Sequence, residues 1–247
     1  MAHQPLVNFV IAGVQKGGTT ALFDYLTEAP GLALSDVKEV HFFDDETVDW
    51  AQPDYAPYHA RFPAADGRPR GEATPIYLYW PQSLERIAAY NPAMRLIVVL
   101  RDPVERAWSH WRMEYSRGAE TQPFDWCIRT GRQRLFDAQP WGAHREYSYV
   151  ERGFYGEQLE RLYALFPRDQ VLLLRSDDLN NAPAAVLGRV GDFLGLRRMP
   201  QPHARRVHVG QAVEGSELTN QDVAHLRQVY AADQIRLKAL AGFDFRG

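Results

Sequence analysis

A short apolar stretch that runs into a glycine-rich loop and then into a helical pattern constrains the fold more than any other feature. Leu6–Ala12 is rich in β-branched and aromatic residues and is followed by glycine, which predicts a buried strand. Thr19–Thr27 has apolar residues at helical spacing and stops before Pro30-Gly31. The loop between them, Gly13–Thr20, has the sequence GVQKGGTT. A strand, a glycine-rich turn and a helix in immediate succession predict a unit that cradles a phosphate group.

The composition of this loop suits an anion. A helix N-terminus offers backbone N–H groups and a partial positive charge, and Gly17 and Gly18 let an anion approach them. Thr19 and Thr20 add hydroxyl donors, and Lys16 adds a mobile positive charge. A glycine turn with no ligand is the alternative interpretation.

The position of the lysine separates this loop from the nucleotide triphosphatase motif Gly-x4-Gly-Lys-Ser/Thr. Gly13 and Gly18 fit that motif, but the next position is Thr19, and the only lysine is Lys16, inside the loop. A kinase needs its lysine against the β- and γ-phosphates. Lys16 would instead lie near a 5'-phosphosulfate bridge, where negative charge develops on the leaving oxygen. A nucleotide-dependent kinase stays the alternative hypothesis.

The rest of the chain alternates buried strands with helices. Further strands are expected at Leu32–Leu34, Arg95–Leu100 and Gln170–Leu174. Helices are expected at Ser83–Tyr90, from Pro103, and at Phe124–Phe136, Gly153–Phe166, Ala184–Leu194 and Gln221–Ala241, and Arg70–Tyr77 is expected to be a turn entering a helix. This order predicts an α/β fold, with one domain over residues 1–247 and a central parallel β-sheet flanked by helices.

Composition excludes several classes of function. The 247 residues carry a net charge of −3, so bulk electrostatics do not predict a nucleic-acid partner. The single cysteine, Cys127, cannot form an internal disulfide or a zinc cluster, and no metal is expected. There is no apolar run of about 18 residues and no signal-peptide pattern, so we expect a cytoplasmic protein without a membrane span.

Two further segments carry groups suited to chemistry. Arg101 follows the strand Arg95–Leu100, where ligands gather in open parallel sheets, and could fork onto a phosphate together with Ser109. An ion pair with a nearby acid is the alternative for Arg101. In Lys38–Asp44, alternation places Glu39 and His41 on one face, where either could take a proton from an acceptor. A surface acid and a satisfied histidine are the alternative there.

The stretch from Arg117 to Arg152 mixes arginines with aromatic residues. Such a mixture could hold an anionic or aromatic acceptor through charge and stacking. A solvated helix face combined with core aromatics is the alternative.

The order of these motifs resembles the PAPS-dependent sulfotransferase family, where PAPS is 3'-phosphoadenosine 5'-phosphosulfate. The closest branch is that of the heparan sulfate 3-O-sulfotransferases and the related N-sulfotransferase domains. The resemblance spans nearly the whole chain. It rests on the segments Gln15–Leu22, Lys38–Asp44, Glu72–Tyr77, Leu100–Ser109, Gly153–Leu159 and Val190–Leu196.

The resemblance implies a role for each matching residue. Lys16 would stabilise the bridging oxygen of PAPS, and Gly17, Gly18, Thr19 and Thr20 would bind its 5'-phosphate. Arg101 and Ser109 would bind the 3'-phosphate, and Tyr155 would contact the nucleotide. Glu39 would be the general base, with His41 and Asp44 beside it. A late basic loop of the family corresponds to Arg205–Gln211, in which Gly210 would approach the nucleotide.

The implied reaction is in-line transfer of a sulfuryl group from PAPS to a hydroxyl or amine of a small-molecule or carbohydrate acceptor, which leaves adenosine 3',5'-bisphosphate. No metal is needed, because positioning and charge stabilisation can carry such a transfer. The branch acting on heparan sulfate usually has lysine where this chain has Ala73, so a cation near the acceptor is missing. A non-catalytic nucleotide-binding protein of the same fold is a further alternative.

Overall fold

Five parallel strands form the central sheet, in the order β2-β3-β1-β4-β5. The computed structural model describes residues 6–138, 142, 144–202 and 216–246. The strands are β1 (Phe9–Gly13), β2 (Ala33–Leu34), β3 (Arg70–Ala73), β4 (Arg95–Leu100) and β5 (Val171–Arg175). Strand β1 lies at the centre and pairs with β3 on one side and β4 on the other. After β1 the chain forms β2 and β3 on one side of it and then β4 and β5 on the other, so the carboxyl ends of β1 and β4 form a topological switch point, where ligands bind in open α/β sheets.

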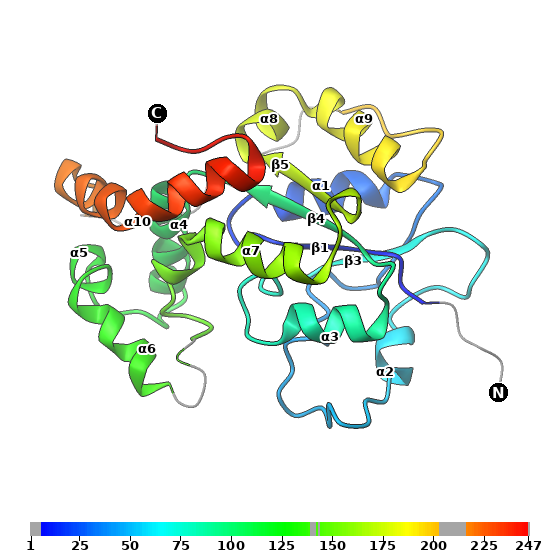
Figure 1. Cartoon of the computed structure of the whole chain (residues 1–247), viewed down its shortest axis with the longest axis horizontal. Coiled ribbons are helices and arrows are strands. Elements are labelled where there is room, and N and C mark those ends of the chain that lie inside the picture. The colour runs from blue at the N-terminus through cyan, green and yellow to red at the C-terminus, as the bar shows by residue number, and fades with distance from the viewer. Residues whose placement is uncertain (1–5, 139–141, 143, 203–215, 247) are drawn as a thin grey trace. The chain divides into compact units, whose positions relative to one another are not determined.

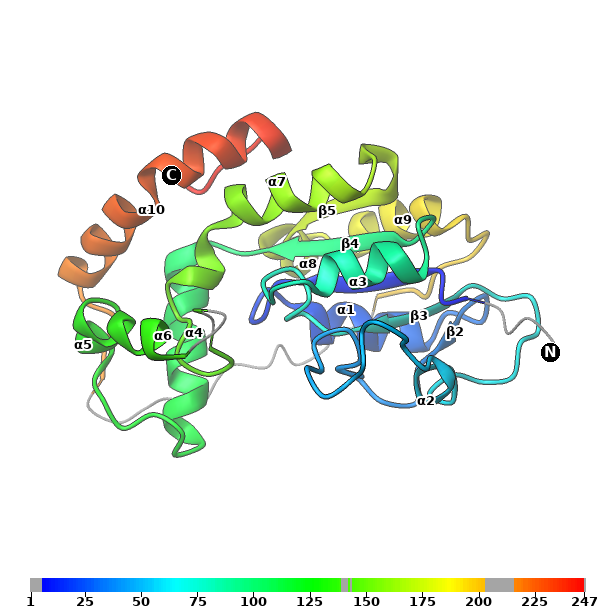
Figure 2. The same ribbon diagram turned by 60° about the horizontal axis from the view of Figure 1, so that its bottom comes forward.

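The described chain forms two compact units, of which the first contains the whole sheet and comprises Met1–Leu100 and Leu162–Val207. Its helices are α1 (Thr19–Thr27), α2 (Ala56–His59), α3 (Ser83–Tyr90), α8 (Ser176–Asn181) and α9 (Pro183–Leu194). Figure 1 and Figure 2 place α1 and α3 on opposite sides of the sheet. Both faces of the sheet are therefore covered, which is why strands β1, β4 and β5 are nearly continuous apolar runs.

Alternate residues of the strands explain how the helices attach. Phe9 and Ile11 of β1 and Ile97 and Val99 of β4 belong to one buried cluster with apolar residues of α1 and α9. The intervening residues, such as Val10, are also fully buried and point to the opposite face. The sequences of β1 and β4 thus supply apolar surface to both layers of helices.

The second unit comprises Arg101–Arg161 and His208–Gly247. Its helices are α4 (Pro103–Ser116), α5 (Phe124–Cys127), α6 (Arg134–Asp137) and α10 (Asn220–Ala241), with short 3₁₀ turns at Thr130–Gln133 and Glu151–Gly153, and α7 (Tyr155–Leu165) begins in it. A buried apolar cluster that includes Trp111, Phe124, Tyr149, Leu226 and Tyr230 joins α4, α5 and α10. This unit therefore has a core of its own.

Most elements expected from the sequence are confirmed, including the α/β class with a central parallel sheet flanked by helices. The extent of one domain over residues 1–247 stays a prediction. The expected continuous helix at Phe124–Phe136 is wrong. The chain there forms α5, a 3₁₀ turn and α6, because Arg129 leaves the helical region with φ −114° and ψ −93°.

The expected turn at Arg70–Tyr77 is also wrong, because Arg70–Ala73 is strand β3, the neighbour of β1. Its short sequence, RGEA, lacks the β-branched residues that mark a buried strand. Two tertiary features explain it. The ring of Phe9 covers Gly71 so closely that a Cβ atom there would lie 2.1 Å from Cζ of the ring. The charged Glu72 is fully buried but has hydrogen-bonding partners inside the unit.

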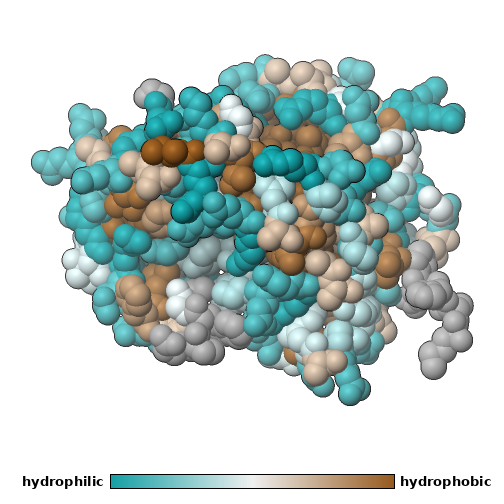
Figure 3. Space-filling view, in the orientation of Figure 1, coloured by the Kyte–Doolittle hydropathy of each residue, from teal (hydrophilic) through white to brown (hydrophobic). Residues whose placement is uncertain are grey.

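The face of the molecule in the orientation of Figure 1 is mainly hydrophilic. Figure 3 shows one face of the molecule, on which hydrophobic residues are scattered among hydrophilic ones. Large hydrophobic side chains that are exposed include Val37, Tyr115, Phe136 and Ile235. Of the helices that the structure describes, none combines the length and apolar character that crossing a membrane requires.

Candidate active site

The loop Gly13–Thr20 follows β1 and leads directly into α1. The N–H of Val14 donates to the carbonyl of Val99 in β4 at 3.1 Å, and the N–H of Gly17 donates back to the carbonyl of Val14 at 2.9 Å. Gly17 lies against β4, where a Cβ atom would come within 2.3 Å of the Val99 carbonyl oxygen. Only glycine fits at that point, so the loop is fixed tightly to the switch point of the sheet.

The start of α1 can receive an anion. Gly18 precedes the helix with φ 101°, and among the described residues no side chain caps the first turn. The turn also contains no acidic residue, so the partial positive charge of the helix is not offset locally. Lys16 adjoins this turn with φ 68°, a left-handed conformation. The structure thus brings the predicted residues Lys16, Gly17, Gly18, Thr19 and Thr20 together in one loop.

A second set of charged groups lies at the end of β3, the strand beside β1. The N–H of Glu39 donates to the carbonyl of Ala73 at 2.9 Å, and Ala73 pairs in register with Ile11 of β1. The predicted residues Glu39 and His41 are therefore attached to the carboxyl end of a strand adjacent to the one that carries the glycine-rich loop. Both segments belong to the same edge of the sheet.

Side chains of this second set form a continuous chain of ionic contacts. Nζ of Lys38 lies 2.5 Å from Oε1 of Glu39, and Nε2 of His41 lies 3.4 Å from the other oxygen, Oε2. On the other side of the imidazole, Nδ1 of His41 lies 2.9 Å from Oδ2 of Asp44, whose side chain is fully buried. Glu39 itself is 39% exposed, so its carboxylate is accessible to an acceptor.

These contacts shift the pKa of both central groups. Burial alone would raise the pKa of Glu39, but hydrogen bonds from His41 and Lys38 and the charge of Lys38 lower it to about 2. Hydrogen bonds to Asp44 and Glu39 raise the pKa of His41 to about 9, against the effect of burial. At neutral pH Glu39 is therefore an ionised carboxylate and His41 is a cation. Of the two, only the Glu39 carboxylate is in a state to accept a proton, and its low pKa makes it a weak base while its contacts with Lys38 and His41 are in place.

The backbone that carries these groups is strained. Glu39 has φ 65° and His41 has φ 57°, and non-glycine residues in this region cost about 1 kcal/mol or more each. The neighbouring Phe42 and Phe43 are buried, with Phe42 stacked on Tyr58 at a ring-centroid distance of 4.9 Å. Surrounding side chains thus hold the segment 38–44 in a conformation that its own residues would not adopt.

Arg101, Ser109 and Tyr155 belong to the second unit. Arg101 is one residue beyond β4, and its guanidinium lies 3.0 Å from Oε2 of Glu105, as the alternative interpretation expected. Ser109 is buried on α4. Tyr155 is fully buried, and its hydroxyl donates to the carbonyl of Arg101 at 2.9 Å. Within this unit Tyr155 therefore holds the backbone of Arg101, and the nucleotide contacts predicted for these residues stay predictions.

Asp102, the residue after Arg101, has a structural role at the start of α4. Its Oδ1 accepts hydrogen bonds from the N–H groups of Val104 and Glu105 at 2.9 and 3.2 Å and so caps α4. Its Oδ2 accepts from Arg227 of α10. Both carboxylate oxygens of Asp102 therefore have hydrogen-bonding partners within the chain.

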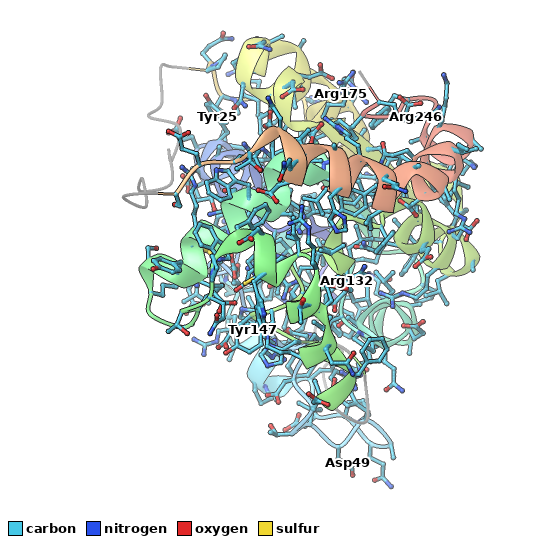
Figure 4. All side chains as sticks on the ribbon, turned by 90° about the vertical axis from the view of Figure 1, so that its left-hand side faces the viewer. Tyr25, Asp49, Arg132, Tyr147, Arg175 and Arg246 are labelled. Carbon is cyan, nitrogen blue, oxygen red and sulfur yellow. The ribbon has the colours of Figure 1, made fainter. Side chains whose placement is uncertain are left out.

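The arginine-rich stretch from 117 to 152 is built into internal ion pairs. Arg129 pairs with Asp222 at 2.7 Å and Arg134 pairs with Glu120 at 2.8 Å. The guanidinium of Arg134 also lies 3.8 Å from the ring centroid of Tyr147, which Figure 4 labels. These contacts favour a structural role for the arginines over a binding site for an anionic acceptor.

Residues 7–209 match the family described as the sulfotransferase domain. The chain belongs to this sulfotransferase family. It is 29% identical over 263 residues to heparan sulfate glucosamine 3-O-sulfotransferase 3B1 of Homo sapiens, and the alignment covers 96% of this chain and 63% of that protein. Heparan sulfate glucosamine 3-O-sulfotransferase 6 of Mus musculus is 33% identical over 195 residues, covering 77% of this chain and 52% of that protein. The chain thus spans less than two thirds of the length of these relatives.

A solved structure supports the same assignment. The crystal structure of a sulfotransferase from Alicyclobacillus acidocaldarius has a TM-score of 0.81 and 25% sequence identity, with 98% of both chains covered. The resemblance inferred from the motifs is therefore confirmed at the level of the family and of its likeness to heparan sulfate 3-O-sulfotransferases.

Sequence reasoning assigned no role to Glu72, a buried acid hydrogen-bonded to residues beside this candidate site. Glu72 is fully buried in β3 and is linked to the segment 38–44 through the Tyr77 hydroxyl, and Glu72–Tyr77 was quoted only as part of a resemblance. A glutamate in a short segment with Gly71 and two nearby tyrosines could have been a signal for a buried acid. The predicted Gly210 and the late basic stretch Arg205–Gln211 lie outside the described residues.

Proposed function

We propose that this chain transfers a sulfuryl group from PAPS to a hydroxyl or amine of a carbohydrate or small-molecule acceptor. The observation that carries the proposal is the placement of two segments at neighbouring strand ends. The loop Gly13–Thr20 at the end of β1 suits an anion, and the chain of contacts from Lys38 to Asp44 at the end of β3 presents an ionised carboxylate. A group transfer needs this pair of features, one for the donor and one for the acceptor.

The loop residues would hold the 5'-phosphosulfate end of PAPS. The uncapped first turn of α1 offers N–H groups and a partial positive charge, and Thr19 and Thr20 add hydroxyl donors. Lys16 would neutralise the negative charge that develops on the oxygen between phosphorus and sulfur as the oxygen–sulfur bond breaks. In the second unit, Arg101 and Ser109 are proposed to bind the 3'-phosphate, with Arg101 exchanging Glu105 for the phosphate.

Glu39 would act as the general base. Its carboxylate would take the proton of the acceptor hydroxyl as the new oxygen–sulfur bond forms, and His41 and Lys38 hold it ionised and oriented. His41 is itself oriented by the buried Asp44. Adenosine 3',5'-bisphosphate leaves with the electron pair of the broken oxygen–sulfur bond, so the proton, the sulfuryl group and the charge are all accounted for.

The relatives suggest the class of acceptor. Two of them are named for 3-O-sulfation of a glucosamine in heparan sulfate, which favours a carbohydrate hydroxyl. Ala73 is fully buried in the apolar cluster of the first unit, so it supplies no cation to a polyanionic acceptor. We therefore propose a carbohydrate or small molecule that carries less negative charge than heparan sulfate. A cytoplasmic location stays a prediction.

Calorimetric titration tests the donor and radiolabel transfer tests the reaction. Adenosine 3',5'-bisphosphate should bind without magnesium and at least about tenfold more tightly than ATP, equivalent to about 1.4 kcal/mol. Labelled PAPS should then transfer its sulfur to acceptors in a panel of sugars and phenols. Magnesium-dependent binding of ATP with no binding of the bisphosphate would favour the kinase alternative. Binding of the bisphosphate without transfer to any acceptor would favour the non-catalytic alternative.

A further inference from the structure

Glu72 is a buried acidic residue that the mechanism leaves without a task, and hydrogen bonds connect it to the segment that carries the proposed base. It lies in β3, pairs in register with Val10 of β1 and has no solvent exposure. Its Oε2 accepts a hydrogen bond from the hydroxyl of Thr74 at 2.5 Å. Its Oε1 accepts from the hydroxyls of Tyr77 at 3.0 Å and Tyr58 at 3.2 Å. A buried carboxylate with three hydroxyl donors is an ordered polar network, which specifies one arrangement of the groups around it.

The network reaches the backbone of the segment that carries Glu39. The Tyr77 hydroxyl accepts hydrogen bonds from the N–H groups of Phe42 at 3.0 Å and Phe43 at 3.4 Å. The N–H of His41 lies 3.5 Å from the Thr74 hydroxyl oxygen, at the outer limit of a hydrogen bond. Tyr77 is thus the main bridge from Glu72 to this backbone, and Thr74 is a weaker one.

The direction of the hydrogen bonds gives Glu72 control over the bridge. An ionised carboxylate only accepts hydrogen bonds, so each hydroxyl must direct its single hydrogen toward Glu72. The oxygen of Tyr77 then turns its lone pairs toward the N–H groups of Phe42 and Phe43. An amide at position 72 would place an N–H against one of the hydroxyls, and that hydroxyl would have to redirect its hydrogen. If that hydroxyl is Thr74, the Tyr77 hydroxyl still exchanges a charged acceptor for a neutral one, so the bridge to the backbone is weakened in either orientation although the shape of the side chain is unchanged.

The segment needs such a support. Glu39 and His41 both have positive φ, and the amides of Phe42 and Phe43 follow directly after them. Strained residues persist only where the surrounding structure over-determines their conformation. The bond from the N–H of Glu39 to the carbonyl of Ala73 fixes one end of the segment, and the Tyr77 hydroxyl fixes the other.

We propose that Glu72 is a positioning residue for the base: its buried carboxylate, acting through the Tyr77 hydroxyl, locks the backbone of residues 41–43 and thereby aims Glu39 and His41. This inference rests on the proposed function, because it assigns Glu72 a task in the same reaction. It adds a claim about the structure itself, which is that the amides of Phe42 and Phe43 are protected through Glu72.

The test uses Glu72→Gln, Tyr77→Phe and the double variant, with Tyr58→Phe as the matched control. Tyr58 also donates to Glu72, but no hydrogen bond from the described backbone of 41–43 reaches its hydroxyl in the structure. Three quantities are measured at pH 8, above the pKa of about 7 to which burial raises Glu72. They are the exchange rates of the Phe42 and Phe43 amides, kcat for transfer from PAPS, and the affinity for adenosine 3',5'-bisphosphate.

We expect Glu72→Gln and Tyr77→Phe each to speed exchange of the two amides by about tenfold and to lower kcat by about tenfold. The affinity for the bisphosphate should stay within about twofold, because the glycine-rich loop is unchanged. The double variant should be no worse than either single variant, since the two residues act in one path. Tyr58→Phe should change exchange and kcat by less than about threefold.

Two results would overturn the inference. One is unchanged exchange of the Phe42 and Phe43 amides in Glu72→Gln, and the other is fully additive losses of kcat in the double variant. If Glu72→Gln does not fold, Tyr77→Phe against Tyr58→Phe decides the same question. Failure of the proposed function gives a different result. If Glu39→Gln still transferred the sulfuryl group at the full rate, Glu39 would not be the base. The exchange of the Phe42 and Phe43 amides would still show whether Glu72 supports the backbone.

Discussion

The two loops at the carboxyl edge of the sheet are held in opposite ways. The loop Gly13–Thr20 is fixed by its own backbone and by the contact of Gly17 with β4. The segment 38–44 is fixed by side chains about 30 residues further along the chain, above all Glu72 and Tyr77. Both contain non-glycine residues with positive φ, at Lys16 in the first and at Glu39 and His41 in the second. A donor loop can therefore be encoded locally, whereas the segment carrying the base depends on distant residues.

Removing the base should give the largest effect on turnover. In Glu39→Gln the amide cannot accept the acceptor proton, so kcat should fall by at least about 10²-fold, while affinity for adenosine 3',5'-bisphosphate stays unchanged. Steady-state kinetics with labelled PAPS measure the first quantity and calorimetry the second. Glu28→Gln, at the exposed end of α1, is the matched control and should keep full turnover. Near wild-type turnover of Glu39→Gln would remove Glu39 as the base.

Removing the cation of the donor loop should lower turnover on a similar scale. Lys16→Ala should reduce kcat by at least about 10²-fold, because the charge on the leaving oxygen is no longer neutralised. Lys238→Ala in α10, whose side chain is 61% exposed, is the control and should have little effect. If Lys16→Ala raises only KM for PAPS and leaves kcat intact, then Lys16 contributes binding alone.

The contrast between the loops explains which parts could be predicted from the sequence. The glycine-rich loop, the strands β1 and β4 and the helix after Asp102 were predictable, because local periodicity, glycine and proline determine them. Strand β3 was not predictable, because Gly71 and Glu72 are uncommon in a buried strand. Gly71 is packed against the ring of Phe9, and Glu72 accepts a hydrogen bond from Tyr77. The same long-range contacts hide the role of Glu72. Glu39, His41 and Asp44 were identified together through the resemblance, but the contact of Lys38 with Glu39 and the charges that result from these contacts were not.

A side chain at position 17 should displace the donor loop from β4. In Gly17→Ala the new Cβ would lie 2.3 Å from the Val99 carbonyl oxygen, so the loop must move away from β4. We expect the free energy of unfolding to fall by about 2 kcal/mol and bisphosphate binding to weaken at least tenfold. Chemical denaturation and calorimetry measure these changes. Gly188→Ala in α9 is the control, because a Cβ there has no described atom within 4 Å, and it should be neutral or slightly stabilising.

The pH dependence of stability should reveal the smaller electrostatic contribution of the segment 38–44. The pKa of His41 is raised from 6.5 to about 9 in the folded chain. Its ionic contacts therefore stabilise the fold fully below about pH 6.5, and this contribution is lost as the pH rises through about 9. Because the side chains of His41 and Glu39 are 45% and 39% exposed, solvent screening keeps the effect under about 1 kcal/mol.

Denaturant unfolding of the wild type and of His41→Asn at pH 6 and pH 9.5 measures this contribution. The stability difference between the two should be present at pH 6 and should shrink at pH 9.5. The exposed ion pair between Arg68 and Asp66 provides the control, because arginine does not titrate in this range. The cost of Arg68→Gln should therefore be the same at both pH values. A His41→Asn difference that is equally constant would mean that His41 is not held as a cation between Glu39 and Asp44, and that packing and hydrogen bonds hold the segment without it.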